Sequence, residues 1–283
     1  MRRRTYLPRP VLYRLLSMLL AVLFLSLPLA SCSASSRVPS DSDTLPVFNW
    51  MDGDTNGNGN GNGNDGDGDR PRVALTFDDG PNHNENRTKN YVDELNKYGY
   101  HATFFVVGKR VNENWWPEYD AVKYAVENGM EIGIHGYSHD VYYTDCTEAE
   151  FLSEMNRTAE EIHKQVPDYE IKLMRPIGGD ISAANAAICP YAIIHWSLDS
   201  KDYEIRQEAT KANWDVKVNE MVEQILSDVE DGDIILMHDI YEFTYDATVI
   251  LLERLNEMGY DVVTVSELLG QTQAGKIYHS EYN

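Results

Sequence analysis

Short apolar runs alternate with longer amphipathic segments along most of this 283-residue chain. The apolar runs have the length of buried strands, and turn-forming residues follow several of them. We therefore expect strands near residues 73–77, 102–107, 131–135, 171–175, 191–198, 233–238 and 261–265. Apolar positions at helical spacing predict helices near residues 87–98, 117–128, 147–165, 212–229 and 246–258.

Strands and helices thus alternate over about 200 residues, which favours a parallel sheet with helical crossovers. A doubly wound sheet and a parallel barrel both have this pattern. Polar residues follow several of the expected strands, as they do in barrels whose chemistry lies at the strand ends. We therefore predict an α/β fold, a distorted (β/α) barrel of about seven parallel strands. We find no internal repeat and no second folded domain.

The first 31 residues depart from this pattern, because five arginines accompany an apolar stretch at residues 15–30. That stretch is short for a transmembrane helix but typical of a signal peptide. It ends in Leu29-Ala30-Ser31-Cys32, which resembles the lipobox of bacterial lipoproteins. We predict that residues 1–31 are a lipoprotein signal peptide and that lipidated Cys32 anchors the protein to the membrane. Ordinary signal-peptidase cleavage nearby is the alternative.

Residues 32–70 form the next segment, which we interpret as a disordered linker. Its Asn-, Gly- and Asp-rich part, residues 56–69, has no apolar residue to bury. A folded domain at residues 71–270 and a C-terminal tail at 271–283 complete the expected organisation. An anchor and a flexible tether suit a domain that works on the cell wall, outside the cytoplasm, although an inert spacer has the same geometry.

Acidic residues outnumber basic residues, at 46 against 24, and the formal net charge is −22. Removal of residues 1–31 deletes five arginines and no acid, so the charge becomes −27. Such a surface excludes nucleic acid as a partner and suits a neutral or amine-bearing glycan outside the cytoplasm; we infer no protein partner. Besides Cys32 the chain has Cys146 and Cys189, which can pair or remain free, and neither has metal-motif spacing.

Residues capable of acid–base or metal chemistry stand at the ends of several predicted strands. Asp78 and Asp79 follow the first strand in Thr-Phe-Asp-Asp-Gly, a sequence that alone is more typical of a capped turn. His135 and His139 follow the third strand, and two imidazoles four residues apart can bind one cation. Because the carboxyl ends of parallel strands meet at one edge, Asp79 can join the two histidines in a His-His-Asp metal set.

Three further groups follow later strands: Arg175 in Arg-Pro-Ile-Gly-Gly, Asp199 in Asp-Ser-Lys-Asp-Tyr, and His238 in Leu-Met-His-Asp. A guanidinium can hold a carboxylate ionised, and glycines can leave a backbone N–H open to an oxyanion. Singly, each group has a structural interpretation, such as a solvated arginine or a packed histidine. Together at one edge of a sheet they indicate an active site.

These five groups, in this order, resemble the five motifs of NodB-like polysaccharide deacetylases, family 4 of the carbohydrate esterases. The resemblance spans roughly residues 70–270. It implies the distorted barrel and a metal-dependent hydrolase that removes N-acetyl groups from amino sugars of a cell-wall polysaccharide. Peptidoglycan, at GlcNAc or MurNAc, is the expected substrate. Zn²⁺ is the expected metal, while Co²⁺, Ni²⁺ and Mn²⁺ suit the same ligands.

The resemblance assigns a role to each candidate residue. The metal ligands would be Asp79, His135 and His139, and the reacting groups would be Asp78 as general base, His238 as general acid and the backbone N–H of Gly178 as oxyanion donor. Arg175 would hold Asp78 ionised, and Asp199 would raise the pKa of His238. Tyr203 and Leu236 would contact the substrate. An acid and a base of this kind give a bell-shaped pH profile for the rate.

Four positions depart from the pattern of that family. Gly136 stands where many members carry Ser or Thr, and Ile177 where proline is common. Gly178 replaces a frequent tyrosine, and Tyr203 replaces the usual tryptophan. None of these changes removes a reacting group, but they leave the shape of the sugar pocket open.

Two other functions fit the same residues. The first is hydrolysis of O-acetyl esters of xylan or of an exopolysaccharide, which keeps the machinery and changes the leaving group. The second is a non-catalytic wall-binding lipoprotein with a decayed site. The presence of every expected reacting group argues against decay.

Overall fold

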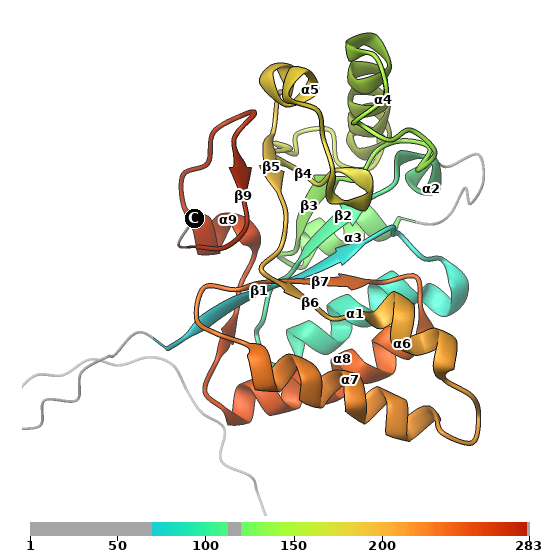
Figure 1. The fold of residues 1–283 in the computed structure, drawn as a ribbon, viewed down its shortest axis with the longest axis vertical. Coiled ribbons are helices and arrows are strands. Elements are labelled where there is room, and N and C mark those ends of the chain that lie inside the picture. Colours follow the sequence, from blue (N-terminus) through green and yellow to red (C-terminus); the bar gives the residue numbers. More distant parts are fainter. Residues whose placement is uncertain (1–69, 113–119, 282–283) are drawn as a thin grey trace, which may run out of the picture. The chain divides into compact units, whose positions relative to one another are not determined.

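The computed structural model describes residues 70–112 and 120–281. In these residues, parallel strands form one curved sheet in the order β6-β7-β1-β2-β3-β4-β5-β9, and β8 pairs with β1 (Figure 1). The strands are β1 Arg72–Asp78, β2 Thr103–Val106, β3 Glu131–Ile134, β4 Leu173–Met174, β5 Ala192–Ile194, β6 Leu198–Asp199, β7 Ile234–His238, β8 Asp261–Val262 and β9 Ile277–Tyr278. The expected signal peptide, lipidated Cys32 and most of the linker lie outside the described residues.

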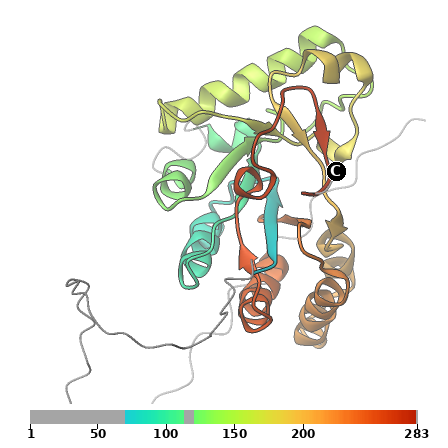
Figure 2. The same ribbon diagram turned by 90° about the vertical axis from the view of Figure 1, so that its left-hand side faces the viewer.

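Figure 2 shows most of the helices on the outer side of the curved sheet. They are α1 Arg87–Asn96, α2 Gly108–Val111, α3 Ala121–Glu127, α4 Glu148–Gln165, α5 Ala183–Ile188, α6 Asp202–Glu208, α7 Trp214–Asp228, α8 Glu242–Glu257 and α9 Val265–Leu269. α4 begins close to the expected residue, because Thr147 and Glu150 form a capping box. α8 begins earlier than expected, at Glu242. None of the helices in the described residues is long and apolar enough to cross a membrane.

The residues of β1 alternate between two apolar clusters. Val73, Leu75 and Phe77 are buried in the large cluster that includes α1, α7 and α8. Ala74 belongs to a smaller cluster that includes Phe105 and side chains of β5, α9 and β9. Because successive strand residues face opposite sides, the smaller cluster fills the inner side of the curved sheet. Asp78, four residues after Ala74, shares that inner face at the carboxyl end of β1.

The expected strand 191–198 is two short strands, and the break between them joins the two ends of the sheet. β5 pairs with β4 and β9, whereas β6 pairs with β7 at the opposite end. Between them, the His195 N–H donates to the carbonyl of Tyr278 and the Ser197 N–H donates to that of Ile234. Residues 195–197 therefore bond to β9 at one end of the sheet and to β7 near the other. Because this segment connects the two ends, the sheet forms a distorted barrel and not an open sheet.

Other differences from the expected elements come from short segments. The segment expected as a C-terminal tail contains β9, which pairs in parallel with β5; two residues give no periodic signal. The strand expected at 261–265 ends early, because Thr264 and Glu267 form the capping box that begins α9. Cys146 and Cys189, whose pairing the sequence left open, are free thiols.

Candidate active site

The carboxyl ends of the strands open into one pocket of about 340 Å³. Nine of the ten candidate residues line it: Asp78, Asp79, His135, His139, Gly178, Asp199, Tyr203, Leu236 and His238. The tenth, Arg175, is fully buried and bonded to Asp78. Tyr142 and Trp196, which the sequence analysis did not select, also line the pocket.

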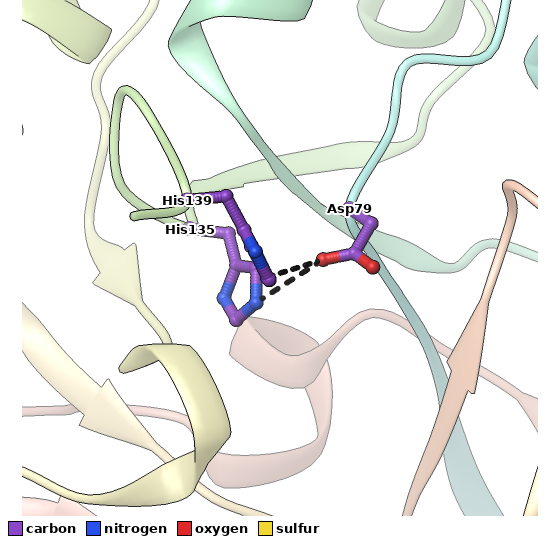
Figure 3. A group of neighbouring side chains, drawn as sticks. All are labelled: Asp79, His135 and His139. Carbon is purple, nitrogen blue, oxygen red and sulfur yellow. Dashed lines mark ion pairs between the residues drawn. The ribbon is translucent and has the colours of Figure 1, made fainter. Parts of the chain in front are cut away.

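Asp79, His135 and His139 converge in this pocket (Figure 3). One potential ligand atom from each residue lies within 4.8 Å of the other two. His139 Nε2 is 2.9 Å from Asp79 Oδ1, and His135 Nε2 is 3.5 Å from the same oxygen. Burial opposes ionisation of Asp79, but the close contact with His139 and the charges of the histidines hold its pKa well below the usual range.

The position of the ring hydrogen of His135 makes the three side chains suitable for a metal ion. Its Nδ1 lies 2.9 Å from the carbonyl oxygen of Arg175, so Nδ1 carries the hydrogen and Nε2 keeps a lone pair. Burial lowers the pKa of His135, which favours this neutral ring. Asp79 Oδ1 is buried and, apart from its ion-pair contacts with the two histidines, has no hydrogen-bond partner. Two acceptors that face each other fit a cation, and one carboxylate with two imidazoles is the ligand set of a catalytic divalent metal.

Two of these three residues have unusual backbone conformations. Asp79 has a φ of 74° and His139 a φ of 63°, a region that few residues other than glycine adopt. Glu154 of α4 anchors the loop that carries His139, because it accepts hydrogen bonds from the N–H groups of Tyr137 and Ser138 at 2.8 and 2.9 Å. Such strain persists where neighbouring contacts hold it. The sequence analysis missed Glu154, because a glutamate within a helix gives no local signal of this role.

Arg175 fixes the orientation of Asp78. Its Nη1 donates to Asp78 Oδ1 at 2.9 Å and to Thr76 Oγ1 at 2.7 Å. Its Nε and Nη2 donate to two backbone carbonyls at the end of β5, where the strand breaks. The other carboxylate oxygen, Oδ2, is 3.7 Å from His135 Nε2. One oxygen of Asp78 is therefore held by Arg175, and the other faces the metal ligands, where a base could act on a water molecule.

His238 is bonded to Asp202, and not to Asp199 as we expected. The Nδ1 and the backbone N–H of His238 each lie 2.8 Å from a carboxylate oxygen of Asp202. Burial lowers the pKa of His238, but the hydrogen bond and the charge of Asp202, with smaller effects from other carboxylates of the pocket, raise it to about 9. An imidazole protonated at neutral pH is what a general acid requires.

Asp199 is bonded within its own loop. Its Oδ2 lies 2.9 Å from Lys201 Nζ and 3.3 Å from the hydroxyl of Tyr203. Lys201 has a φ of 57° and turns the chain between β6 and α6. After this turn Asp202, the first residue of α6, reaches β7. Both acids belong to the motif that the sequence analysis selected, but the choice between them depends on the turn.

Comparison with known proteins identifies the family. A family model described as polysaccharide deacetylase matches residues 65–190. A peptidoglycan-N-acetylglucosamine deacetylase of Bacillus cereus is 33% identical over 205 residues, which cover 70% of this chain and 87% of that protein. This chain belongs to the polysaccharide deacetylase family. A chitin deacetylase of Colletotrichum lindemuthianum is 32% identical over 209 residues, which cover 70% of this chain and 79% of that protein.

Longer members of the family match through one part of their chains. The peptidoglycan-N-acetylmuramic acid deacetylase PdaC of Bacillus subtilis is 35% identical over 196 residues, which are 69% of this chain and 38% of PdaC. This chain spans about two fifths of the length of PdaC and of its Listeria monocytogenes relative PgdA. The solved structure of T48 deacetylase with substrate has a TM-score of 0.64 at 32% identity, covering 74% of this chain and 96% of that one. The predicted distorted (β/α) barrel is thereby confirmed.

Two departures from the pattern of polysaccharide deacetylases have a structural explanation. Gly136 has a φ of 79°, and a Cβ there would lie 2.5 Å from the hydroxyl of Tyr143 and 3.0 Å from Ile177. The larger Ser or Thr of other members would therefore not fit. Gly178 has a φ of 67°, and a Cβ there would have one neighbour within 4 Å, the ring of Tyr142 at 3.7 Å. The pocket is consequently open beside Gly178.

Gly80 packs directly against Asp239, the residue that follows His238. A Cβ at Gly80 would lie under 3.0 Å from three carboxylate atoms of Asp239. Asp239 is fully buried and accepts a hydrogen bond from Thr88 Oγ1. Burial raises the pKa of Asp239 to about 7. This contact joins the loop that carries Asp79 to the strand end that carries His238.

Gly80→Ala should therefore lower the free energy of unfolding by about 2 kcal/mol, because the methyl group overpacks a buried contact. The matched variant is Gly80→Ala with Asp239→Ala, in which the methyl group has room. In urea unfolding, the free energy of unfolding of the double variant should exceed, by at least about 1 kcal/mol, the value expected from adding the effects of the two single substitutions. The contact is contradicted if Gly80→Ala costs the same with and without the Asp239 carboxylate.

Proposed function

We propose that this protein is a metal-dependent hydrolase that removes N-acetyl groups from amino sugars of peptidoglycan, at GlcNAc or MurNAc. The observation that carries the proposal is the arrangement of three groups in one pocket: the metal set around Asp79, the carboxylate of Asp78, and protonated His238. A base and an acid in the same pocket as a divalent-metal site suit hydrolysis of an amide, whose leaving nitrogen must gain a proton.

A bound divalent metal, which we propose is Zn²⁺ with Co²⁺, Ni²⁺ or Mn²⁺ as alternatives, would polarise the acetyl carbonyl and acidify water. Asp78 accepts a proton from the attacking water through the oxygen that Arg175 leaves free. His238 then donates its proton to the leaving nitrogen, and Asp202 keeps the imidazole protonated until that step. The backbone N–H of Gly178, in the pocket wall, donates to the developing oxyanion.

Named relatives support a peptidoglycan substrate. Two of them are named for deacetylation of GlcNAc and of MurNAc in peptidoglycan. The pocket offers aromatic surfaces at Tyr142, Trp196 and Tyr203, with Leu236 beside them, for packing against a sugar ring. Hydrolysis of O-acetyl esters is the alternative, since the solved structure of a family 4 acetyl xylan esterase from Clostridium thermocellum is 29% identical to this chain, with a TM-score of 0.62.

We further propose that the protein works outside the cytoplasm, anchored to the membrane through lipidated Cys32. The basic and apolar residues 1–31 and the lipobox-like sequence support this placement. Residues 32–70 would then tether the catalytic domain within reach of the cell wall. The cell-wall names of the relatives agree with an extracytoplasmic enzyme.

Acetate release by the purified full-length protein tests the proposed function. We expect the metal-stripped protein to be inactive and Zn²⁺ to restore release from peptidoglycan and from chitin oligomers. Release from acetylated xylan should be slower. A preference for acetylated xylan would replace the amide substrate with an ester, and stoichiometric metal without release from any substrate would favour a non-catalytic wall-binding lipoprotein.

A further inference from the structure

The arginines of the described residues fall into two groups. Five of the eight pair with a carboxylate: Arg70, Arg72, Arg87, Arg175 and Arg254. The other three, Arg110, Arg157 and Arg206, are exposed and make no ion pair with any described carboxylate. Because no described acid holds them, their guanidinium groups remain available to a ligand. The position of these three arginines is therefore informative.

Arg110 lies beside the metal set. It belongs to α2, in which the N–H groups of Gly108 and Lys109 donate to the carbonyls of Gly136 and Tyr137 at 2.9 and 2.8 Å. Those carbonyls belong to the loop between the two metal-ligand histidines. These backbone contacts place Arg110 next to the loop that carries His139.

Arg157 and Arg206 are stacked on tyrosines of the two catalytic loops. The guanidinium of Arg157 lies 3.6 Å from the ring centre of Tyr137, in the loop of the metal ligands. The guanidinium of Arg206 lies 3.9 Å from the ring centre of Tyr241, whose ring is 5.8 Å from that of His238. A guanidinium over an aromatic face is held in place, while most of its N–H groups, which point outward in the plane of the guanidinium, remain available to an anion.

We propose that Arg110, Arg157 and Arg206 form an anion-binding rim that recognises acidic groups on the glycan next to the deacetylated sugar. The proposal rests on the proposed function and names its substrate class as an anionic wall glycan. Chitin and xylan backbones are neutral, whereas the peptides attached to peptidoglycan carry carboxylates and wall polymers carry phosphates. A chain with a formal charge of −22 repels such a glycan at long range, so cations beside the loops of the pocket would offset this repulsion.

The test compares anionic and neutral substrates of the full-length, zinc-loaded protein. The variant is Arg110→Gln/Arg157→Gln/Arg206→Gln, and the matched control is Arg254→Gln, which removes an arginine that already pairs with Glu223. We expect the triple variant to raise KM for peptide-bearing peptidoglycan fragments about tenfold. KM for neutral chitin oligomers should change less than twofold, and kcat should change for neither. Added salt should remove the difference between wild type and variant.

Two further arms identify the acidic group. If carboxylates are bound, fragments whose peptide carboxylates are amidated should show the same KM with the wild type and the triple variant. If phosphates are bound, removal of the phosphate polymers from wall material should abolish the difference in KM in the same way. An equal rise in KM for neutral and anionic substrates, or no rise for either, would overturn the proposal of an anion-binding rim. If the wild type releases no acetate, the proposed function fails separately. Cosedimentation with insoluble peptidoglycan then tests the anion-binding rim without catalysis. The triple variant should bind less peptidoglycan than Arg254→Gln, and equal binding would overturn the proposal.

Discussion

Asp79→Ala is expected to abolish tight metal binding and to lower acetate release about a thousandfold. Asp79 is the one carboxylate of the metal set, and both histidine Nε2 atoms lie within 3.5 Å of its Oδ1. Without it, two imidazoles would remain, and one of them, His139, is partly exposed. Loss of a catalytic metal removes several kcal/mol of transition-state stabilisation, which corresponds to this factor. Metal content after dialysis and acetate release from chitin oligomers measure the two effects.

Asp78→Asn distinguishes the base from the metal ligand beside it. The amide keeps the size of the side chain, and its oxygen can still accept from Arg175 Nη1, but it cannot accept a proton from water. We expect this variant to keep its metal and to lose acetate release by at least about a hundredfold. Asp228→Ala, at an exposed position of α7, serves as the neutral control. Full activity of Asp79→Ala, or loss of metal from Asp78→Asn, would contradict the division of roles.

The sequence was sufficient to find most of the site, for a physical reason. Parallel strands end at the same edge, so polar residues that follow different strands meet even when they are far apart in the chain. Asp78, His135 and His238 were predicted in this way and line one pocket. The helical spacing of α4 and α7 was also visible, because their apolar faces repeat over several turns.

The sequence could not show contacts that depend on a single turn or on a distant element. Lys201, in a left-handed conformation, decides that Asp202 rather than Asp199 reaches His238. Glu154 holds the loop of the metal ligands from the middle of α4. β9 consists of two residues whose partner, β5, lies some 80 residues earlier. Each of these contacts is set by tertiary structure, which local patterns do not encode.

Asp202→Asn should move the alkaline limb of the pH profile of kcat/KM to lower pH by at least two units. His238 must be protonated to act as the acid, and burial is the largest influence on its pKa and lowers it. In the wild type the hydrogen bond and charge of Asp202 outweigh burial and raise the pKa to about 9, a value that a bound dication would reduce. In the variant, burial prevails and the pKa falls below the ordinary value of 6.5, so most rings are neutral at pH 7.5 and acetate release there falls at least about tenfold.

Asp199→Asn is the matched control, because it removes a neighbouring carboxylate that does not contact His238. It can change KM, but the alkaline limb should remain where it is. The metal-free protein offers a second measurement, since a raised pKa in the folded state stabilises the fold below the unfolded pKa near 6.5 and the contribution disappears as pH rises through 9. The free energy of unfolding should therefore fall over this range by up to about 3 kcal/mol more in the wild type than in Asp202→Asn. If Asp199→Asn moves the limb and Asp202→Asn does not, His238 is protonated through Asp199, and the Asp202 pairing does not govern the acid.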